Sequence, residues 1–139
     1  MAKEIGKFYH SKSNWDKAIN FYEMHLNNNA DDFETQLLLL QVYSEKKDFV
    51  TLAKKADSLQ ELYPAQPQFY YYSGLAYNQL SQFKKAISAL ETGIEYVLND
   101  LALEINFNIQ LGEAWSGLGD EKKKESYFLK ADGLMKREK

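Results

Sequence analysis

The sequence predicts an all-α fold, and three observations lead to that prediction. Only two prolines and seven glycines interrupt the 139 residues. Apolar residues recur at helical spacing rather than at the alternating spacing of a half-buried strand. Landmark residues also return at a fixed repeat interval of about 34 residues, which is typical of stacked repeats.

The repeat interval connects three sets of positions. Small or apolar residues, tyrosines and large aromatic residues each recur with it, at Ala18, Leu52 and Ala86; at Tyr9, Tyr43 and Tyr77; and at Trp15, Phe49 and Phe83. A fourth set follows after a slip of four, since Gly112 lies four positions beyond the place that one interval from Gly74 would reach. The four extra residues lie near 101–104 and amount to about one helical turn.

The first two intervals are each expected to hold a pair of antiparallel helices. The expected helices span 3–11 and 15–26, then 32–45 and 49–62. Turn-forming residues separate them, at Ser13-Asn14, at the asparagines 27–29 and at Lys47-Asp48. Asp32 is expected to cap the third helix, because its carboxylate can accept free N–H groups of the first turn.

The last two pairs are expected at 68–80 and 83–98, then at 101–118 and 121–136. The segment from Pro64 to Pro67 precedes them, and Ser81-Gln82, Asn99-Asp100 and Gly119-Asp120 separate their helices. Asp100 is expected to cap its helix as Asp32 does.

The repeated motifs resemble those of the tetratricopeptide repeat family, whose pattern is Trp-x2-Leu-Gly-x2-Tyr, then Ala-x3-Phe, then Pro. The first unit reads Ile5-Gly6-x2-Tyr9 and then Ala18-x3-Tyr22, and the third reads Tyr70-x2-Ser73-Gly74-x2-Tyr77 and then Ala86-x3-Leu90. The fourth reads Leu111-Gly112-x2-Trp115, with Phe128 and Ala131 later. The second has Leu40 in place of the glycine and ends at Pro64. The resemblance covers essentially the whole chain.

The resemblance implies a right-handed superhelical array of antiparallel helix pairs, a tetratricopeptide-like α-solenoid. It implies a single domain over residues 1–139, with units at about 1–32, 33–66, 67–100 and 105–138 and a four-residue insertion near 101–104.

Both ends of the array depart from the family pattern. Lys124 stands where paired helices need a small residue, and Glu121 stands where earlier units have a large ring. The last helix is therefore expected to pack loosely. The first unit begins partway through its first helix, which indicates a segment of a longer array and leaves Phe8 without its normal cover. Weak self-association at high concentration is therefore expected.

The stretch FYYYSGLAY, residues 69–77, has three competing interpretations. It could be a buried strand, a stacking platform for bases, or a repeat helix whose neighbour presses against Gly74. The repeat interval favours the helix. Gly74 is then expected to be the tightest helix contact, and Gly93 a somewhat more forgiving one.

In the family, the first helices of the pairs line a concave groove. The groove positions expected to bind a peptide are Leu37, Gln41, Tyr71, Leu75, Asn78, Ile109 and Glu113. No charged residue occurs from 62 to 83, so Tyr71, Leu75 and Asn78 are expected to form an uncharged floor. The alternative is that a middle helix of an array lacks charge because it is mostly buried. Both interpretations stay open.

Composition argues against several function classes. The net charge of −3 gives no electrostatic attraction to nucleic acid, and the longest apolar run, 37–40, is far too short to span a membrane. The chain has no cysteine, its two histidines lack metal-ligand spacing, and it has no glycine-rich phosphate loop. No catalytic, cofactor or metal site is therefore expected. Since no signal peptide is recognisable, the cytoplasm is the default location, with export as part of a longer protein as the alternative.

The sequence thus favours a non-catalytic protein–protein interaction scaffold that binds a peptide or protein segment in a concave groove. The alternative is a structural or self-associating segment of a longer array without its own ligand. The lysine-rich clamp that some family members use for C-terminal carboxylates is matched only at Lys3, one position in five. A nucleic-acid reader is disfavoured, because its groove would need to be basic and this one carries only Lys3 and Lys7, with Glu34 and Glu113 elsewhere.

Overall fold

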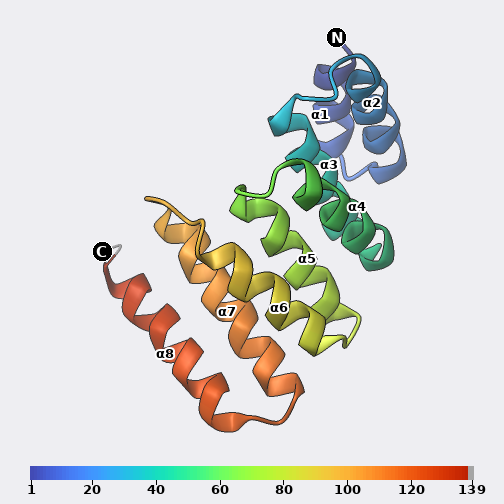
Figure 1. Ribbon diagram of the computed structural model, residues 1–139. Coiled ribbons are helices and arrows are strands. Elements are labelled where there is room, and N and C mark those ends of the chain that lie inside the picture. Colours follow the sequence, from blue (N-terminus) through green and yellow to red (C-terminus); the bar gives the residue numbers. More distant parts are fainter. Residues whose placement is uncertain (138–139) are drawn as a thin grey trace. The chain divides into compact units, whose positions relative to one another are not determined.

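The computed structural model describes residues 1–137, which form eight α-helices and no strand (Figure 1). The helices are α1 (Ala2–Ser11), α2 (Trp15–Asn28), α3 (Phe33–Lys46), α4 (Phe49–Leu62), α5 (Pro67–Gln79), α6 (Phe83–Ile94), α7 (Leu101–Gly117) and α8 (Glu121–Arg137). The all-α prediction is confirmed. Among the described residues, no helix combines the length and the apolar character needed to cross a membrane.

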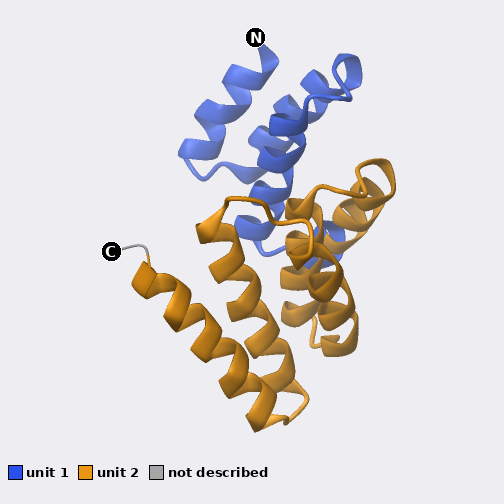
Figure 2. Cartoon of the chain, turned by 60° about the vertical axis from the view of Figure 1, so that its left-hand side comes forward, with its two compact units in different colours: residues 1–52 blue, residues 53–139 orange. Residues whose placement is uncertain are grey.

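The chain divides into two compact units, coloured separately in Figure 2. Unit 1 is Met1–Leu52 and holds α1, α2, α3 and the start of α4. Unit 2 is Ala53–Lys139 and holds the rest of α4 together with α5 to α8.

One backbone turn recurs between the two helices of each pair. Its left-handed residue has a positive φ at Ser13 (58°), Lys47 (65°), Ser81 (58°) and Gly119 (80°). The N–H of the following residue donates to the carbonyl of an aromatic residue five positions back, in the pairs Asn14–Tyr9, Asp48–Tyr43, Gln82–Tyr77 and Asp120–Trp115. This is the Schellman arrangement that ends many helices. The aromatic residues that recur in the sequence are therefore the ones whose carbonyls accept the hydrogen bond of this turn.

Three of the helix pairs pack through a gap left by a glycine on the first helix. In each case a large side chain of the second helix occupies the gap, and a Cβ added to the glycine would lie under 3 Å from it. The pairs are Gly6 with Tyr22 (2.6 Å), Gly74 with Leu90 (2.3 Å) and Gly112 with Phe128 (2.3 Å). Atoms cannot approach so closely, so these helices can pack this way only because the side chain is absent.

Gly93 differs from the sequence prediction, because it lies in a contact at least as tight as that of Gly74. A Cβ at Gly93 would lie 2.3 Å from Tyr70 Cβ and 3.0 Å from the Phe107 ring. Tyr70 Cβ is attached to the backbone and cannot turn away, whereas the Leu90 atoms that face Gly74 belong to the end of a side chain. Gly93 is therefore the less tolerant position.

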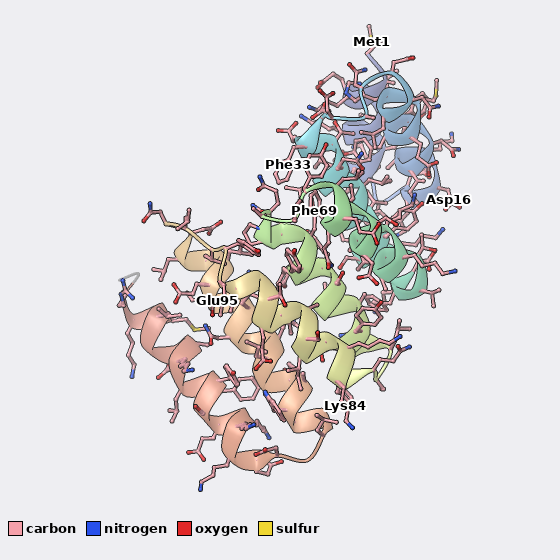
Figure 3. The ribbon with its side chains drawn as sticks, viewed as in Figure 1. Met1, Asp16, Phe33, Phe69, Lys84 and Glu95 are labelled. Atoms are coloured by element: carbon pink, nitrogen blue, oxygen red, sulfur yellow. The ribbon has the colours of Figure 1, made fainter. Side chains whose placement is uncertain are left out.

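The expected helix boundaries hold within two residues, except at the end of α6. The prediction of a helix to residue 98 is wrong, since α6 ends at Ile94 and Glu95 is the first residue beyond it (Figure 3). Just beyond the end of α6, the Tyr96 ring stacks on the Tyr70 ring of α5, with 5.8 Å between centroids. The next helix, α7, has 17 residues, four more than the 13 of α5.

Asp32 and Asp100 cap α3 and α7, as the sequence predicts. Asp32 accepts hydrogen bonds from the Thr35 N–H (3.2 Å) and hydroxyl (2.9 Å), from Lys3 Nζ (3.1 Å) and from His25 Nε2 (2.8 Å). Burial by itself raises the pKa of the Asp32 carboxyl, but the hydrogen bonds from Lys3, His25 and Thr35 outweigh it and hold that pKa well below its usual range. This carboxylate therefore connects α1 and α2 to the start of α3.

At the other end of the chain, α8 buries only Ala131 among its described residues. Phe128 reaches the gap at Gly112, but most other side chains of α8 are exposed. The contact of Phe128 at Gly112 is as close as that of Leu90 at Gly74, so the loose packing expected from Lys124 and Glu121 is not seen at this contact.

Alanine scanning of three helical glycines tests the packing. Gly74→Ala and Gly93→Ala are expected to lower the free energy of unfolding by about 1–3 kcal/mol, with the larger loss at Gly93. Gly133→Ala is the control, because a Cβ there meets nothing within 4 Å. It is expected to stabilise α8 by up to about 1 kcal/mol. Urea denaturation measures all three, and equal midpoints for Gly93→Ala and Gly133→Ala would contradict the packing described above.

Replacing Asp32 tests the cap and its pH dependence. Asp32→Ala is expected to lower the free energy of unfolding by about 2 kcal/mol at pH 7. Because the folded-state pKa is depressed, the stabilisation is present above the unfolded pKa of about 4 and is lost as the pH falls further. The gap between wild type and variant should therefore narrow from pH 7 to pH 3 in urea denaturation. The exposed neighbour Asp31 provides the control Asp31→Ala, and a gap that stays constant with pH would refute the role given to the Asp32 charge.

Candidate functional site

Tyr71, Leu75 and Asn78 lie at successive turns on one face of α5, as the helical spacing predicts. Tyr71 and Leu75 are half-buried, and Asn78 is 8% exposed. The Tyr71 ring lies edge-on to Phe107 of α7, with 5.7 Å between centroids and 66° between planes. Burial raises the pKa of the Tyr71 hydroxyl. Tyr71 is thus held between α5 and α7, and part of it stays open to solvent.

Asn78 is committed to a contact with α7. Its Nδ2 donates to the backbone oxygen and to Oε1 of Gln110, both at 2.9 Å. Its Oδ1 is buried and has no hydrogen-bond partner among the described residues. Asn78 therefore positions α5 against α7, and its polar neighbour on α7 is Gln110. The sequence analysis missed Gln110, because nothing local links two residues 32 positions apart.

The remaining predicted groove residues lie on α7 and on α3. Ile109 is half-buried and Glu113 is exposed, one turn apart on α7, so these two share unit 2 with the α5 residues. Leu37 is half-buried and Gln41 is exposed, one turn apart on α3 of unit 1.

The two lysines expected at one end of the groove are paired. Lys3 Nζ lies 2.8 Å from Glu34 Oε1, and Lys7 Nζ lies 3.3 Å from the same oxygen. Lys3 also contacts Asp32. These carboxylates balance the charge that a nucleic-acid phosphate would need to meet.

Burial explains much of the missing charge on α5. The helix buries more than half of its residues, namely Pro67, Phe69, Tyr70, Ser73, Gly74, Ala76 and Asn78. The half-buried positions Tyr71, Tyr72, Leu75 and Tyr77 also lack charge, although partial exposure would tolerate it. Burial therefore accounts for the lack of charge at the buried positions, and the interpretation as a peptide-binding surface remains for the half-buried ones.

A carboxylate on α4 faces the opposite side of the α5 motif. Ser73 Oγ donates to Asp57 Oδ1 at 2.7 Å, and the Tyr77 hydroxyl donates to Oδ2. Burial and the hydrogen bond to Asp57 raise the pKa of Tyr77 to about 12. Ser73 is fully buried, so a substrate cannot reach its hydroxyl. The cluster therefore serves to hold α4 against α5.

Both histidines connect helices of unit 1. His10 Nδ1 lies 3.0 Å from the Tyr22 hydroxyl and its Nε2 lies 2.6 Å from Glu45, while His25 contacts Asp32. Within residues 1–137, no three potential ligands are grouped in a way that could hold a metal ion.

No protein-family model and no curated protein matches the sequence. Several solved structures do resemble this one. MamA from Desulfovibrio magneticus RS-1 has a TM-score of 0.82 at 20% identity, covering 98% of this chain and 75% of that chain. TTC0263, a thermophilic TPR protein in Thermus thermophilus, has a TM-score of 0.77 at 18% identity, covering 96% of this chain and 72% of that chain.

BtubC from P. vanneervenii also matches, with a TM-score of 0.78 at 18% identity over 98% of this chain and 62% of that chain. At such identities the likeness shows the fold alone. The fold is a tetratricopeptide-like helical repeat, as the repeated motifs predict.

Proposed function

We propose that this chain, which has a tetratricopeptide-like fold, is a non-catalytic scaffold that binds a peptide or protein segment along α5 and α7. One observation carries the proposal. On α5, half-buried Tyr71 and Leu75 present a surface without charge, and Tyr71 and Asn78 contact Phe107 and Gln110 of α7.

The setting of Tyr71 suits recognition. Its ring packs against Phe107 and is ordered before any partner arrives, so binding immobilises little. Aromatic side chains at the centre of an interface often account for much of the binding energy. Gln110 is half-buried and contacts Asn78, so a polar group borders the apolar part. A segment that buries an apolar side chain against Tyr71 and Leu75 fits this arrangement.

We assign a similar role on unit 1 to Leu37 and Gln41. They pair a half-buried apolar side chain with an exposed amide on one face of α3. The nearby carboxylate of Glu34 is engaged by Lys3 and Lys7, so strong net charge is absent there too.

Tyr71→Ala tests the proposal. For a partner captured by wild type, the variant is expected to bind about thirtyfold more weakly, which corresponds to about 2 kcal/mol for an aromatic anchor. Tyr9→Ala on α1 is the matched control, since Tyr9 is also half-buried and lies outside both α5 and α7. Circular dichroism must show both variants folded. Equal affinities for the two variants would place the binding surface elsewhere.

A second candidate function is self-association, and Phe8 is the observation that favours it. This side chain on α1 is 56% exposed, next to Tyr9 and below the Lys12 ammonium. Wild type is expected to form weak oligomers at millimolar concentration in light scattering, and Phe8→Lys is expected to reduce them. A wild-type protein that stays monomeric at that concentration removes this candidate.

A further inference from the structure

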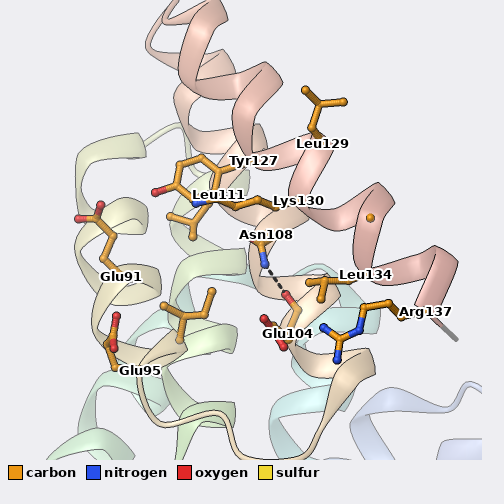
Figure 4. Close-up of a pocket in the computed structure, with 12 residues that line it drawn as sticks. Glu91, Glu95, Glu104, Asn108, Leu111, Tyr127, Leu129, Lys130, Leu134 and Arg137 are labelled. Atoms are coloured by element: carbon orange, nitrogen blue, oxygen red, sulfur yellow. Dashed lines mark hydrogen bonds between the residues drawn. The ribbon is translucent and has the colours of Figure 1, made fainter.

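A groove runs between α6 and α8, over α7, on helices of unit 2 (Figure 4). Its volume is about 930 Å³. Leu111 of α7, which is 1% exposed, lies in it with the half-buried apolar residues Ile94, Tyr127 and Leu134. A helix about 10 Å thick fills roughly 400 Å³ per turn, so the groove has room for about two turns.

The two walls carry opposite charges that do not meet. Glu91 and Glu95 lie one turn apart on α6, with Glu104 near the start of α7, while Lys130 and Arg137 come from α8 (Figure 4). Among the described residues, none of the three glutamates lies within ion-pair distance of a basic side chain. Like charges one turn apart on a helix also destabilise it slightly. The three glutamates therefore form a negatively charged wall without a basic partner among the described residues.

Gly133 on α8 lines the same groove and has no packing role in the described structure. A Cβ at Gly133 would meet nothing within 4 Å, in contrast to Gly74, Gly93 and Gly112. A glycine inside a helix costs about 1 kcal/mol relative to alanine. Since no neighbour within the chain needs this gap, close approach by something outside it is the physical use that remains.

Tyr127 provides an anchor beside this gap. Its ring is half-buried under the Lys130 ammonium, with 4.8 Å from Nζ to the centroid. In Figure 4 the Tyr127 hydroxyl points toward α6, and burial and the negative charge of Glu91 raise its pKa.

We propose that this groove is a second protein-binding site, which takes one helix of a partner protein. The partner helix carries an apolar row that packs on Leu111, Tyr127 and Leu134. Basic residues beside that row face Glu91 and Glu95, and acidic residues on its other side face Lys130 and Arg137. The helix passes over Gly133, where no side chain obstructs it. This site lies on α6 and α8 with Leu111 of α7 between them, and it shares no residue with the surface on α5 and α7.

A synthetic peptide of about 18 residues, roughly 27 Å long as a helix, is the probe. It has leucines at helical spacing, lysines along one side of the leucine row and glutamates along the other, with a fluorescent label at one end. Fluorescence anisotropy with the full chain is expected to give a micromolar dissociation constant. A second peptide, with glutamates on both sides, is expected to bind at least about tenfold more weakly.

Gly133 offers a matched pair of variants. Gly133→Trp is expected to fill the groove and weaken binding at least about tenfold, while the single methyl group of Gly133→Ala is expected to weaken binding by a smaller factor, because it limits the close approach of the partner helix. The double variant Glu91→Lys with Glu95→Lys is expected to bind the peptide more weakly by a similar factor, because its new lysines repel the lysines of the peptide. Circular dichroism confirms that each variant is folded, and the exposed positions make loss of the fold unexpected.

The outcomes separate this proposal from the proposed function. Tyr71→Ala is expected to leave binding of the synthetic peptide unchanged. If Tyr71→Ala abolishes binding and Gly133→Trp does not, the peptide lies on α5 and α7, and the present proposal falls while the proposed function stands. No binding by wild type at millimolar peptide, or equal binding of the two peptides, also overturns the proposal.

Discussion

The close approach of paired helices at a missing side chain is the constraint on which the rest of the structure depends. At Gly6, Gly74 and Gly112 the second helix of the pair inserts a large residue that leaves no room for a Cβ. Leu40 takes the place of this glycine on α3 and is fully buried. Because close packing leaves few alternative arrangements, the choice of residue at these positions determines which faces of the helices remain outside.

Much of the fold could be predicted because its determinants repeat or are local. The Schellman turn returns with the same interval as Tyr9, Tyr43 and Tyr77, whose carbonyls accept its hydrogen bond. The left-handed residues of the first three turns are Ser13, Lys47 and Ser81, and each lies in a turn that the repeat interval and the turn-forming residues together predict. Asp32 and Asp100 followed from a rule that involves only the next three residues.

The errors and omissions involve partners far along the chain. Tyr70 is involved in both errors, because it presses on Gly93 and stacks on Tyr96, just beyond the end of α6. The link from Asn78 to Gln110 spans 32 residues and has no sequence signature. The α6–α8 groove was missed for the same reason, although Gly133 in the middle of a helix was a local signal that no motif explained. For the predicted peptide surface, the helical spacing of the sequence identified which residues share a face of α5. The exposed fraction of each side chain depends on neighbouring helices and could not be predicted.

The composition of α7 follows from its place between these surfaces. Its 17 residues carry only two charges, Glu104 and Glu113. Glu104 lines the groove with α6 and α8, and Glu113 is exposed. Between them, Phe107 supports Tyr71 while Leu111 lies in the groove. The α5 face is uncharged, so contacts there depend mainly on apolar burial and respond weakly to salt, whereas a helix in the groove would be held partly by charge and respond strongly. The low charge of α7 follows from its contacts with α5, α6 and α8, which leave it little of the solvated, charged face that an ordinary outer helix carries.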